Sequence, residues 1–260
     1  MTTLPFFQVD AFADGPLTGN PAAVMPLDQW LDDELMQRIA AENNLSETAF
    51  MVPSDRDDAD FDLRWFTPAT EVELCGHATL ASAHVLLTGD AVRFSTRSGI
   101  LTVTREDDLL QLDLPGAPLS EVREPELCNA VGLPDSPVWL ATACNDAAIM
   151  EVADEAAVRA TSPDFAALAK IHRMAIVTAR GDREDVVSRV FVSYCGIDED
   201  PVTGSAHAAL VPYWAKRLGR HQFTAFQASK RGGLVQCREA GDRVILGGKC
   251  VTVIEGHFQL

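Results

Sequence analysis

The apolar and polar residues follow two different patterns along the chain. Many short segments alternate between apolar and polar side chains, or carry branched and aromatic residues between turn residues, and both features are typical of β-strands. The strands that these patterns predict are Phe6–Phe12, Asn20–Met25, Leu45–Val52, Phe61–Phe66, Ala91–Ser95, Ile100–Thr104, Leu109–Leu114, Val138–Ala143, Ile149–Val152, Met174–Thr178, Ser188–Cys195, Phe223–Gln227, Gly233–Cys237, Arg243–Leu246 and Lys249–Ile254. Helices are predicted at Trp30–Asn44, Pro125–Val131, Glu155–Arg159 and Asp164–Lys170.

A further segment has the length of a helix but almost no charge. This segment, Glu73–Gly89, begins with Cys75, Gly76 and His77 and continues with small or apolar residues on nearly all sides. Such a helix is expected to be enclosed by other structure, with Gly89 as its C-terminal stop. The free N–H groups and the positive dipole end of its first turn favour a thiolate or a bound carboxylate.

A second uncharged segment, Asp200–Gly219, resembles the first. It leads through Thr203, Gly204 and Ser205 into a helix of small residues, and the tripeptide Ser-Ala-His occurs in both segments, at 82–84 and 205–207. We therefore expect two similar halves, each wrapped around one buried helix whose N-terminus faces a shared cleft. Halves that are rich in strands with one long helix each do not fit a parallel βαβ alternation, so the expected fold class is α+β.

The stretch Pro115–Pro118 is the best candidate for a domain boundary, because it concentrates proline and glycine. We expect an N-terminal domain of residues 1–116 and a C-terminal domain of residues 117–248. The final strand, within residues 249–260, is expected to return to the first domain and to make it discontinuous.

The net charge restricts the class of partner. The 260 residues carry a formal net charge of −17 at pH 7, and this charge repels the phosphates of nucleic acid. A small molecule is the favoured ligand. If the ligand is an anion, helix N-termini and a few arginines must supply a local positive potential against the general field.

Other sequence signals exclude several kinds of site. The six cysteines show no C-x-x-C spacing and no clustering with histidines, which disfavours a metal site. There is no glycine-rich dinucleotide loop and no phosphate-binding loop, so a nucleotide cofactor is not indicated. The chain shows no basic leader and no apolar run of about 18 residues, so we expect a cytoplasmic protein with no membrane partner.

Glu47 is a single carboxylate within the neutral segment Leu45–Val52. Because strands deplete glutamate, its presence has two explanations: a solvated residue of an edge strand, or a general acid or base among apolar neighbours. His77 and Cys75 leave a similar choice open, because each is either a buried packing residue or part of a site.

The stretches Gly19–Ala22, Asn44–Phe50, Cys75–Thr79, Glu199–Ala206 and Gln227–Gly233 span most of the chain. Together and in this order they resemble the phenazine biosynthesis isomerase-like (PhzF-like) proteins of the diaminopimelate epimerase and proline racemase superfamily. The resemblance implies the diaminopimelate epimerase-like fold, a pair of barrel-like α+β domains, with the active site in the cleft between them. It also implies no metal, no organic cofactor and, commonly, a homodimer.

The resemblance further implies roles for the matched residues. Glu47 would move a proton from one carbon of the substrate to another, while His77, Asp200 and Ser205 would bind and polarise the substrate. The residues expected to bind substrate are Asn20, Gly76, Thr203, Gly204, Arg231 and Gly232. Arg231 is by default a surface charge, and beside two glycines it is alternatively a residue that holds an anion.

The racemases of this superfamily use two opposed cysteines, one in each half. The chain has Cys75 at the first position and Asp200-Pro201 in the region of the second, with Cys195 on the preceding strand. A cysteine pair is therefore disfavoured, and a lone Glu47 or a pair of Glu47 with Cys75 or Asp200 remains open.

We expect an isomerase or epimerase that acts on a small anionic metabolite bearing a carboxylate. The alternative, from a different class, is a catalytically inactive small-molecule-binding or scaffold protein with the same fold.

Overall fold

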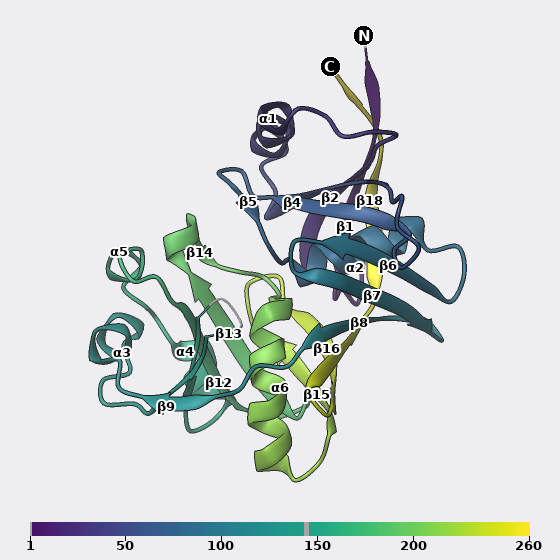
Figure 1. Ribbon diagram of the computed structural model, residues 1–260. Helices are drawn as coiled ribbons and strands as arrows, with labels where there is room; N and C mark the ends of the chain where they lie inside the picture. The colour runs from purple at the N-terminus through teal and green to yellow at the C-terminus, as the bar shows by residue number, and fades with distance from the viewer. Residues whose placement is uncertain (1, 143–145) are drawn as a thin grey trace. The chain divides into compact units, whose positions relative to one another are not determined.

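The computed structural model describes residues 2–142 and 146–260. The chain divides into two compact units, and each is described by itself (Figure 1). Unit 1 comprises Met1–Asp113 and Gly247–Leu260, and unit 2 comprises Leu114–Leu246. Ala143, the expected end of one strand, and Cys144 lie outside the described residues.

Unit 1 is a mostly antiparallel sheet with two helices. Strand β1 pairs antiparallel with both β18 and β2, β2 pairs parallel with β3, β3 antiparallel with β4, and β4 antiparallel with β5 and parallel with β6. The pairs β6–β7 and β7–β8 are antiparallel. The elements are β1 Thr3–Ala11, β2 Asn20–Pro26, α1 Asp33–Asn43, β3 Glu47–Pro53, β4 Phe61–Phe66, β5 Glu71–Val72, α2 Gly76–Leu86, β6 Ala91–Thr96, β7 Gly99–Glu106, β8 Leu109–Pro115 and β18 Cys250–Gln259.

Unit 2 repeats this order of pairings. Strand β10 pairs antiparallel with β9 and β11, β11 parallel with β12, β12 antiparallel with β13, β13 antiparallel with β14 and parallel with β15, and β15 antiparallel with β16. The elements are β9 Ser120–Val122, α3 Pro125–Val131, β10 Val138–Ala141, β11 Ala147–Glu151, α4 Glu155–Ala160, α5 Phe165–Leu168, β12 Met174–Arg180, β13 Val186–Val192, the 3-10 helix η1 Ser193–Cys195, β14 Ile197–Glu199, α6 Gly204–Leu218, β15 Gln222–Gln227, β16 Gly233–Ala240 and β17 Arg243–Gly248. The predicted α+β class is confirmed, whereas closure of the sheets into barrels stays a prediction.

Helix α2 is enclosed as its composition predicted. All residues from Gly76 to Ala83 are buried, and the helix contacts β1, β2, β3, β7 and β18. The prediction that Gly89 stops the helix was wrong. The helix ends at Leu86, and Leu87 leaves in an extended conformation with its N–H bound to the carbonyl of Ala83, so no left-handed glycine is required. Helix α6 does end as predicted, at Gly219 with a φ of 68°.

The Ser-Ala-His tripeptides of the two helices are not equivalent. The first helical residues are Gly76 and Gly204, so Ser205 is the second residue of its helix, whereas Ser82 lies two turns into α2. The comparable residues are therefore His77 and Ser205. Small residues recur in any enclosed helix, which explains why this match was misleading. Cys195, expected on a strand, lies in the 3-10 helix that follows β13.

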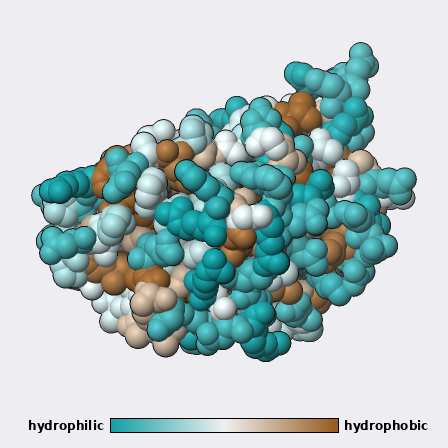
Figure 2. Space-filling model, turned by 90° about the horizontal axis from the view of Figure 1, so that it is seen from below, coloured by the Kyte–Doolittle hydropathy of each residue, from teal (hydrophilic) through white to brown (hydrophobic). Residues whose placement is uncertain are grey.

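Each unit has an apolar core on its sheet. In unit 1, Met25, Met36, Ile39 and Phe50 pack between α1 and the sheet. In unit 2, the core includes Leu127, Val158 and Phe191. Hydrophilic residues cover most of the face shown in Figure 2, and hydrophobic ones occur there in separate small groups. Among the helices in the described ranges, none has the length and apolar character needed to cross a membrane.

The turn before β2 depends on Gly19, which has a φ of +66°. An added Cβ would collide with the backbone oxygen of Ala11, and non-glycine residues in this conformation cost about 1–3 kcal/mol even without a clash. We predict that Gly19→Ala lowers the free energy of unfolding in urea by about 2 kcal/mol or more. Gly15→Ala is the matched control, because a Cβ at Gly15 meets no atom within 4 Å. Equal losses for the two variants would contradict this account of the turn.

Candidate active site

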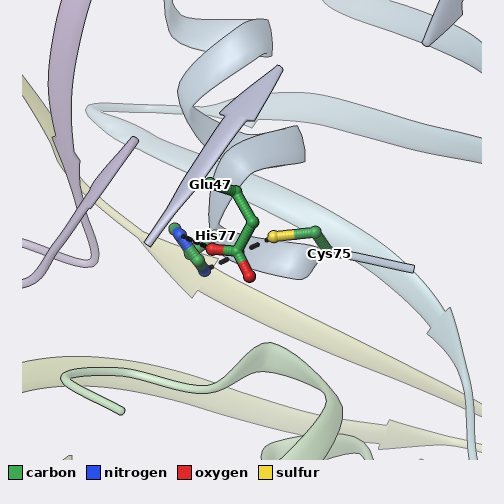
Figure 3. A group of neighbouring side chains, drawn as sticks. All are labelled: Glu47, Cys75 and His77. Atoms are coloured by element: carbon green, nitrogen blue, oxygen red, sulfur yellow. Dashed lines mark hydrogen bonds and ion pairs between the residues drawn. The ribbon is translucent and has the colours of Figure 1, made fainter. Parts of the chain in front are cut away.

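Three predicted residues converge at the start of α2, and we call them the Glu47 cluster: Glu47, Cys75 and His77 (Figure 3). Glu47 is the first residue of β3, Cys75 is the N-cap of α2, and His77 is the second residue of that helix. His77 Nε2 lies 3.0 Å from Glu47 Oε2, and His77 Nδ1 lies 3.6 Å from Cys75 Sγ. The imidazole therefore stands between a carboxylate and a thiol.

Asn20 orients the imidazole from β2. Its Nδ2 lies 3.2 Å from His77 Nδ1, and its Oδ1 accepts a hydrogen bond of 3.0 Å from Ser46 Oγ. A neutral ring that accepts at Nδ1 carries its proton on Nε2, and a charged ring carries protons on both nitrogens. In either state an N–H on Nε2 faces Glu47.

The two atoms that face each other in this pair are shielded from solvent. Glu47 Oε2 and His77 Nε2 are buried, yet neither makes a hydrogen bond of favourable geometry within the described chain. Buried polar atoms are normally satisfied, and those that are not are frequent at functional sites. The close approach of these two atoms, without a further partner among the described residues, makes them candidates for the chemistry of the site.

Cys75 is a buried thiol rather than the thiolate that a helix N-terminus favours. Burial, and then the nearby charge of Glu47, raise the pKa of Cys75 to about 11. Its side chain makes no capping hydrogen bond with α2. Desolvation outweighs the helix dipole here, so Cys75 is protonated at neutral pH and is poorly suited to act as a base.

The Glu47 cluster also contains donors of the kinds that zinc takes. One oxygen, one sulfur and one nitrogen lie within 4.8 Å of one another. Cys75 would have to lose a proton to bind a cation, and the positive end of α2 opposes a cation. The arrangement therefore favours anions and proton transfer.

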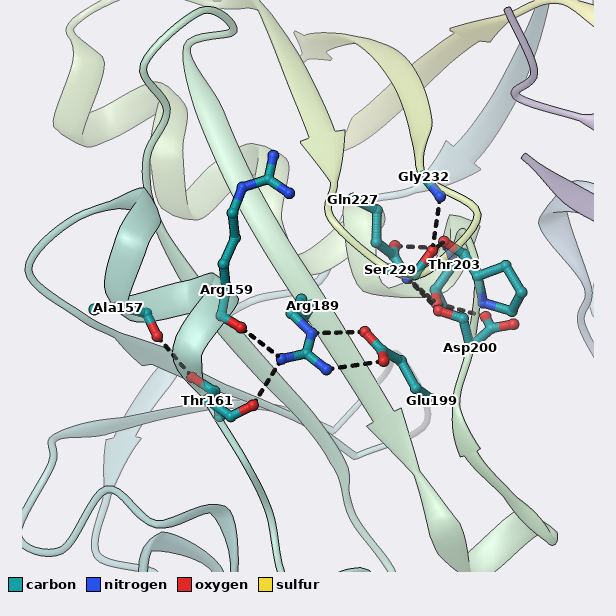
Figure 4. Close-up of polar contacts among 11 residues, drawn as sticks. Ala157, Arg159, Thr161, Arg189, Glu199, Asp200, Thr203, Gln227, Ser229 and Gly232 are labelled. Carbon is teal, nitrogen blue, oxygen red and sulfur yellow. Dashed lines mark hydrogen bonds and ion pairs between the residues drawn. The ribbon is translucent and has the colours of Figure 1, made fainter. Parts of the chain in front are cut away.

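Two of the predicted residues of unit 2, Asp200 and Thr203, lie together directly before α6 (Figure 4). Thr203, the N-cap, donates from Oγ1 to Asp200 Oδ2 at 2.5 Å. Gln227 at the end of β15 accepts from the Thr203 backbone N–H at 2.9 Å and donates to the Asp200 carbonyl at 2.7 Å. Asp200, Thr203 and Ser205 are all buried. Asp200, Thr203 and Gln227 thus form a hydrogen-bonded group directly before α6, and the Glu47 cluster lies at the corresponding end of α2.

Gln227 was not singled out from the sequence. A lone glutamine at a strand end has no distinctive pattern, and the only available signal was its place at the start of the matched stretch Gln227–Gly233. Gly232 has a structural reason to be glycine, because its φ is +68° and a Cβ would meet the Phe226 ring at 2.7 Å. Its N–H binds Ser229 Oγ at 3.1 Å. The anion-holding role of Arg231 stays a prediction.

The structure thus assembles two groups from the predicted residues. Asn20, Glu47, Cys75, Gly76 and His77 belong to the group in unit 1. In unit 2, Asp200 and Thr203 are hydrogen-bonded to each other, and Gly204 and Ser205 follow in the first turn of α6. Gly232 is linked to Pro201 through Ser229, with Arg231 beside it in sequence.

Comparison with known proteins identifies relatives along the whole chain. The family model described as phenazine biosynthesis-like protein matches residues 9–256. An uncharacterized isomerase of Pseudomonas aeruginosa is 52% identical over 264 residues, with 99% of each chain covered. The crystal structure of a phenazine biosynthesis protein of the PhzF family from Enterococcus faecalis superposes with a TM-score of 0.91 at 42% identity and covers 100% of both chains. A hydroxyproline epimerase from Agrobacterium vitis shares the fold, with a TM-score of 0.65 at 11% identity, covering 98% of this chain and 92% of that one.

The pairing of His77 with Glu47 predicts a specific dependence of stability on pH. Burial lowers the pKa of His77, but the carboxylate of Glu47 against Nε2 raises it, so that it lies well above 6.5. A raised pKa stabilises the fold fully below the unfolded value, and this contribution is lost as the pH rises through the folded value. In urea unfolding measured as the pH is raised from about 6 upward, we expect the native protein to lose stability relative to Glu47→Gln. Parallel curves for the two proteins would show that Glu47 does not hold the His77 proton.

Proposed function

The chain belongs to the phenazine biosynthesis-like protein family, and from this premise we propose that it is an isomerase that moves a proton on a small carboxylate-bearing metabolite. Glu47 is the acid and base of the proposed reaction. The observation that carries the proposal is the approach of His77 Nε2 to Glu47 Oε2, at 3.0 Å, at the N-terminus of an enclosed helix. The name of the Pseudomonas aeruginosa relative, an isomerase, agrees with this reaction class.

The chemistry explains why the site needs both a base and a positive potential. A carbon acid beside a carboxyl or carbonyl group is weak, so its proton must be taken by a base in a site with little water. The resulting negative charge on oxygen needs donors fixed in place before the reaction. The N–H groups of the first turn of α2 can supply these donors, and Gly76 lets a ligand approach the backbone because it has no Cβ.

The proposed sequence of steps uses the described side chains only. Glu47 takes a proton from one carbon of the substrate while His77 donates from Nε2 to the oxygen that becomes negative. In a 1,3-shift, Glu47 then returns the proton to another carbon, an existing double bond of the substrate moves, and the first carbon becomes part of the new double bond. In an epimerisation no other carbon is protonated, and a second acid returns a proton to the other side of the first carbon. Cys75, which is protonated at neutral pH, is the alternative acid for the second step.

Asp200 and Ser205 are proposed to bind polar groups of the substrate. Asp200 is held by Thr203 at 2.5 Å and is therefore oriented before a ligand arrives. Ser205 occupies the position in α6 that His77 occupies in α2. The substrate itself is proposed only as a class, a small anion with an acidic C–H bond.

Solvent exchange tests the reaction class directly. The protein is incubated in heavy water with a panel of amino and hydroxy acids, chosen by thermal shift because a bound ligand stabilises the fold by mass action. Deuterium at one carbon of a bound acid is the expected result. Binding without exchange for every acid that shifts the melting temperature would instead identify a catalytically inactive binding protein.

The assignment of the base predicts a large effect of Glu47→Gln. Glutamine keeps the shape of the side chain but removes the carboxylate, so we expect turnover to fall by on the order of 10²-fold or more. Ligand binding measured by thermal shift should change little. Cys75→Ala and Asp200→Asn are the comparison variants. An active Glu47→Gln beside an inactive Cys75→Ala or Asp200→Asn would show that the base is another residue.

We also propose that the protein is a homodimer that associates through β18. This ten-residue strand carries Ile254, an exposed large apolar side chain. Glu255 and His257 lie on either side of Gly256, so two antiparallel copies centred there would place the Glu255 carboxylate of one copy opposite the His257 imidazole of the other. Light scattering should give twice 28.1 kDa. Ile254→Lys should give the monomer, whereas Leu17→Lys, at another exposed apolar residue, should leave the dimer. A monomeric native protein, or a dimer that tolerates Ile254→Lys, would contradict the proposal.

A further inference from the structure

An ion pair of the same geometry is present in both units. Arg64 on β4 binds Glu71 on β5 through Nε to Oε1 at 2.7 Å and Nη2 to Oε2 at 2.9 Å. Arg189 on β13 binds Glu199 on β14 through the same atoms at 2.7 and 2.9 Å (Figure 4). We call these pairs the two clamps. Each ties a strand of two or three residues to a long strand of its sheet.

The surroundings of the clamps match in their aromatic contacts, although Glu71 has a second partner in Arg97, whose Nη2 lies 2.7 Å from Oε2. Each clamp arginine precedes a phenylalanine by two positions and packs over its ring, at 5.2 Å for Arg64 and Phe66 and at 4.9 Å for Arg189 and Phe191. Each of these phenylalanines is also the residue that pairs with the clamp glutamate across the sheet. The geometry is therefore repeated by the fold and is not a chance contact of two long side chains.

The third nitrogen of each clamp arginine binds the end of a neighbouring helix. Arg64 Nη1 binds Asp33 in the first turn of α1 at 2.7 Å. Arg189 Nη1 binds the carbonyl of Thr161, the C-cap of α4, at 2.7 Å. Each guanidinium thus joins a long strand, a short strand and a helix, which uses the fork of donors that arginine has and lysine lacks.

The glutamate of each clamp has the same separation in sequence from the helix of the candidate site that follows it. Glu71 lies four residues before Cys75, the N-cap of α2, and Glu199 lies four residues before Thr203, the N-cap of α6. The residues between differ completely, Val-Glu-Leu in unit 1 and Asp-Pro-Val in unit 2. We call residues 72–75 and 200–203 the lead-in segments. The two segments have the same length and the same position but present different side chains. Directly after the clamp glutamate, unit 1 has Val72 and unit 2 has Asp200.

The last residue of each lead-in segment, which is the N-cap of the helix, is held by a hydrogen bond from a side chain of that helix. In α2 the fourth residue, Thr79, donates from Oγ1 to the Cys75 carbonyl at 2.6 Å. In α6 the fourth residue, His207, binds the Thr203 carbonyl through Nδ1 at 2.8 Å. Each lead-in segment is therefore fixed at both ends, by a clamp before it and by a helix side chain after it.

We infer that Arg64–Glu71 and Arg189–Glu199 are positioning devices, each of which aligns the site residues of its own unit by holding the lead-in segment. The inference rests on the function proposed above. Arg64 acts on Cys75 and His77, and Arg189 acts on Asp200 and Thr203. Neither arginine is a catalytic residue, because each acts through the backbone that it holds.

Burial separates the clamps from an ordinary surface ion pair. The side chains of Arg64 and Glu71 are 18% and 15% exposed, and those of Arg189 and Glu199 are 14% and 20% exposed. The pair of Arg56 with Asp58 has the same two-bond geometry, at 2.7 and 2.9 Å, but its side chains are 54% and 58% exposed. Exposed pairs contribute little to stability, so Arg56 provides a matched control.

Backbone hydrogen exchange in three arginine-to-lysine variants tests the inference without an assay for turnover. Lysine keeps the charge but cannot make the two-bond fork. We expect Arg189→Lys to accelerate exchange in residues 197–205 by about tenfold or more, and Arg64→Lys to do so in residues 71–77. Each variant should leave the segment of the other unit unchanged, and Arg56→Lys should affect neither. Urea unfolding measured in parallel corrects for any change in global stability.

Turnover provides the second readout once an exchangeable substrate is found. A shift of about 1 Å in a site residue can cost on the order of 10²-fold in rate, so Arg64→Lys should lower kcat by about tenfold or more with little change in KM. Arg189→Lys, which loosens residues proposed to bind the substrate, should also raise KM. Exchange that rises uniformly, or in both segments together, would overturn the inference, as would unchanged exchange. If no acid undergoes solvent exchange with the native protein, the proposed function fails, while the hydrogen-exchange result still decides whether the clamps hold the lead-in segments.

Discussion

The enclosed N-terminus of α2, with Glu47 against His77, is the constraint on which the rest of the structure depends. A carboxylate that is removed from water loses solvation and needs a partner or a hydrogen bond. His77 supplies the partner, Asn20 orients it, and the helix N-terminus supplies a positive potential. Because the helix must be surrounded to create this environment, its residues from Gly76 to Ala83 are small or fit tightly among the strands.

The repeated fold supplies this environment twice, with different chemistry in each copy. The order of parallel and antiparallel pairings around α2 recurs around α6. Where α2 has Cys75 and His77, α6 has Thr203 and Ser205. The two units therefore share the arrangement of strands, clamps and helix N-termini. They differ in the side chains at the helix N-terminus, and these side chains determine the chemistry of each unit.

Much of this fold could be predicted because the strands alternate clearly and the two helices lack charge. The bounds of Phe61–Phe66 and Pro125–Val131 agree with the structure. The short strands β5, β9 and β14 were not predicted, because two or three residues show no periodicity, and β5 and β14 are held in place by side chains of the long strands β4 and β13. The contact of Glu47 with His77 could be suspected only through the family resemblance, since 30 positions separate the two residues in the sequence. The protonated state of Cys75 depends on burial and on the charge of Glu47, and neither is visible from the order of residues.

The central claim is that one carboxylate both removes and returns the proton. The most direct test is conversion, in ordinary water, of a substrate that carries deuterium at the reacting carbon. A single base holds the same deuteron through both steps, so the account predicts that part of the label is retained in the product of the first turnover. Product without any label, formed while the remaining substrate keeps its label, would show that a second group delivers the proton and would contradict the account.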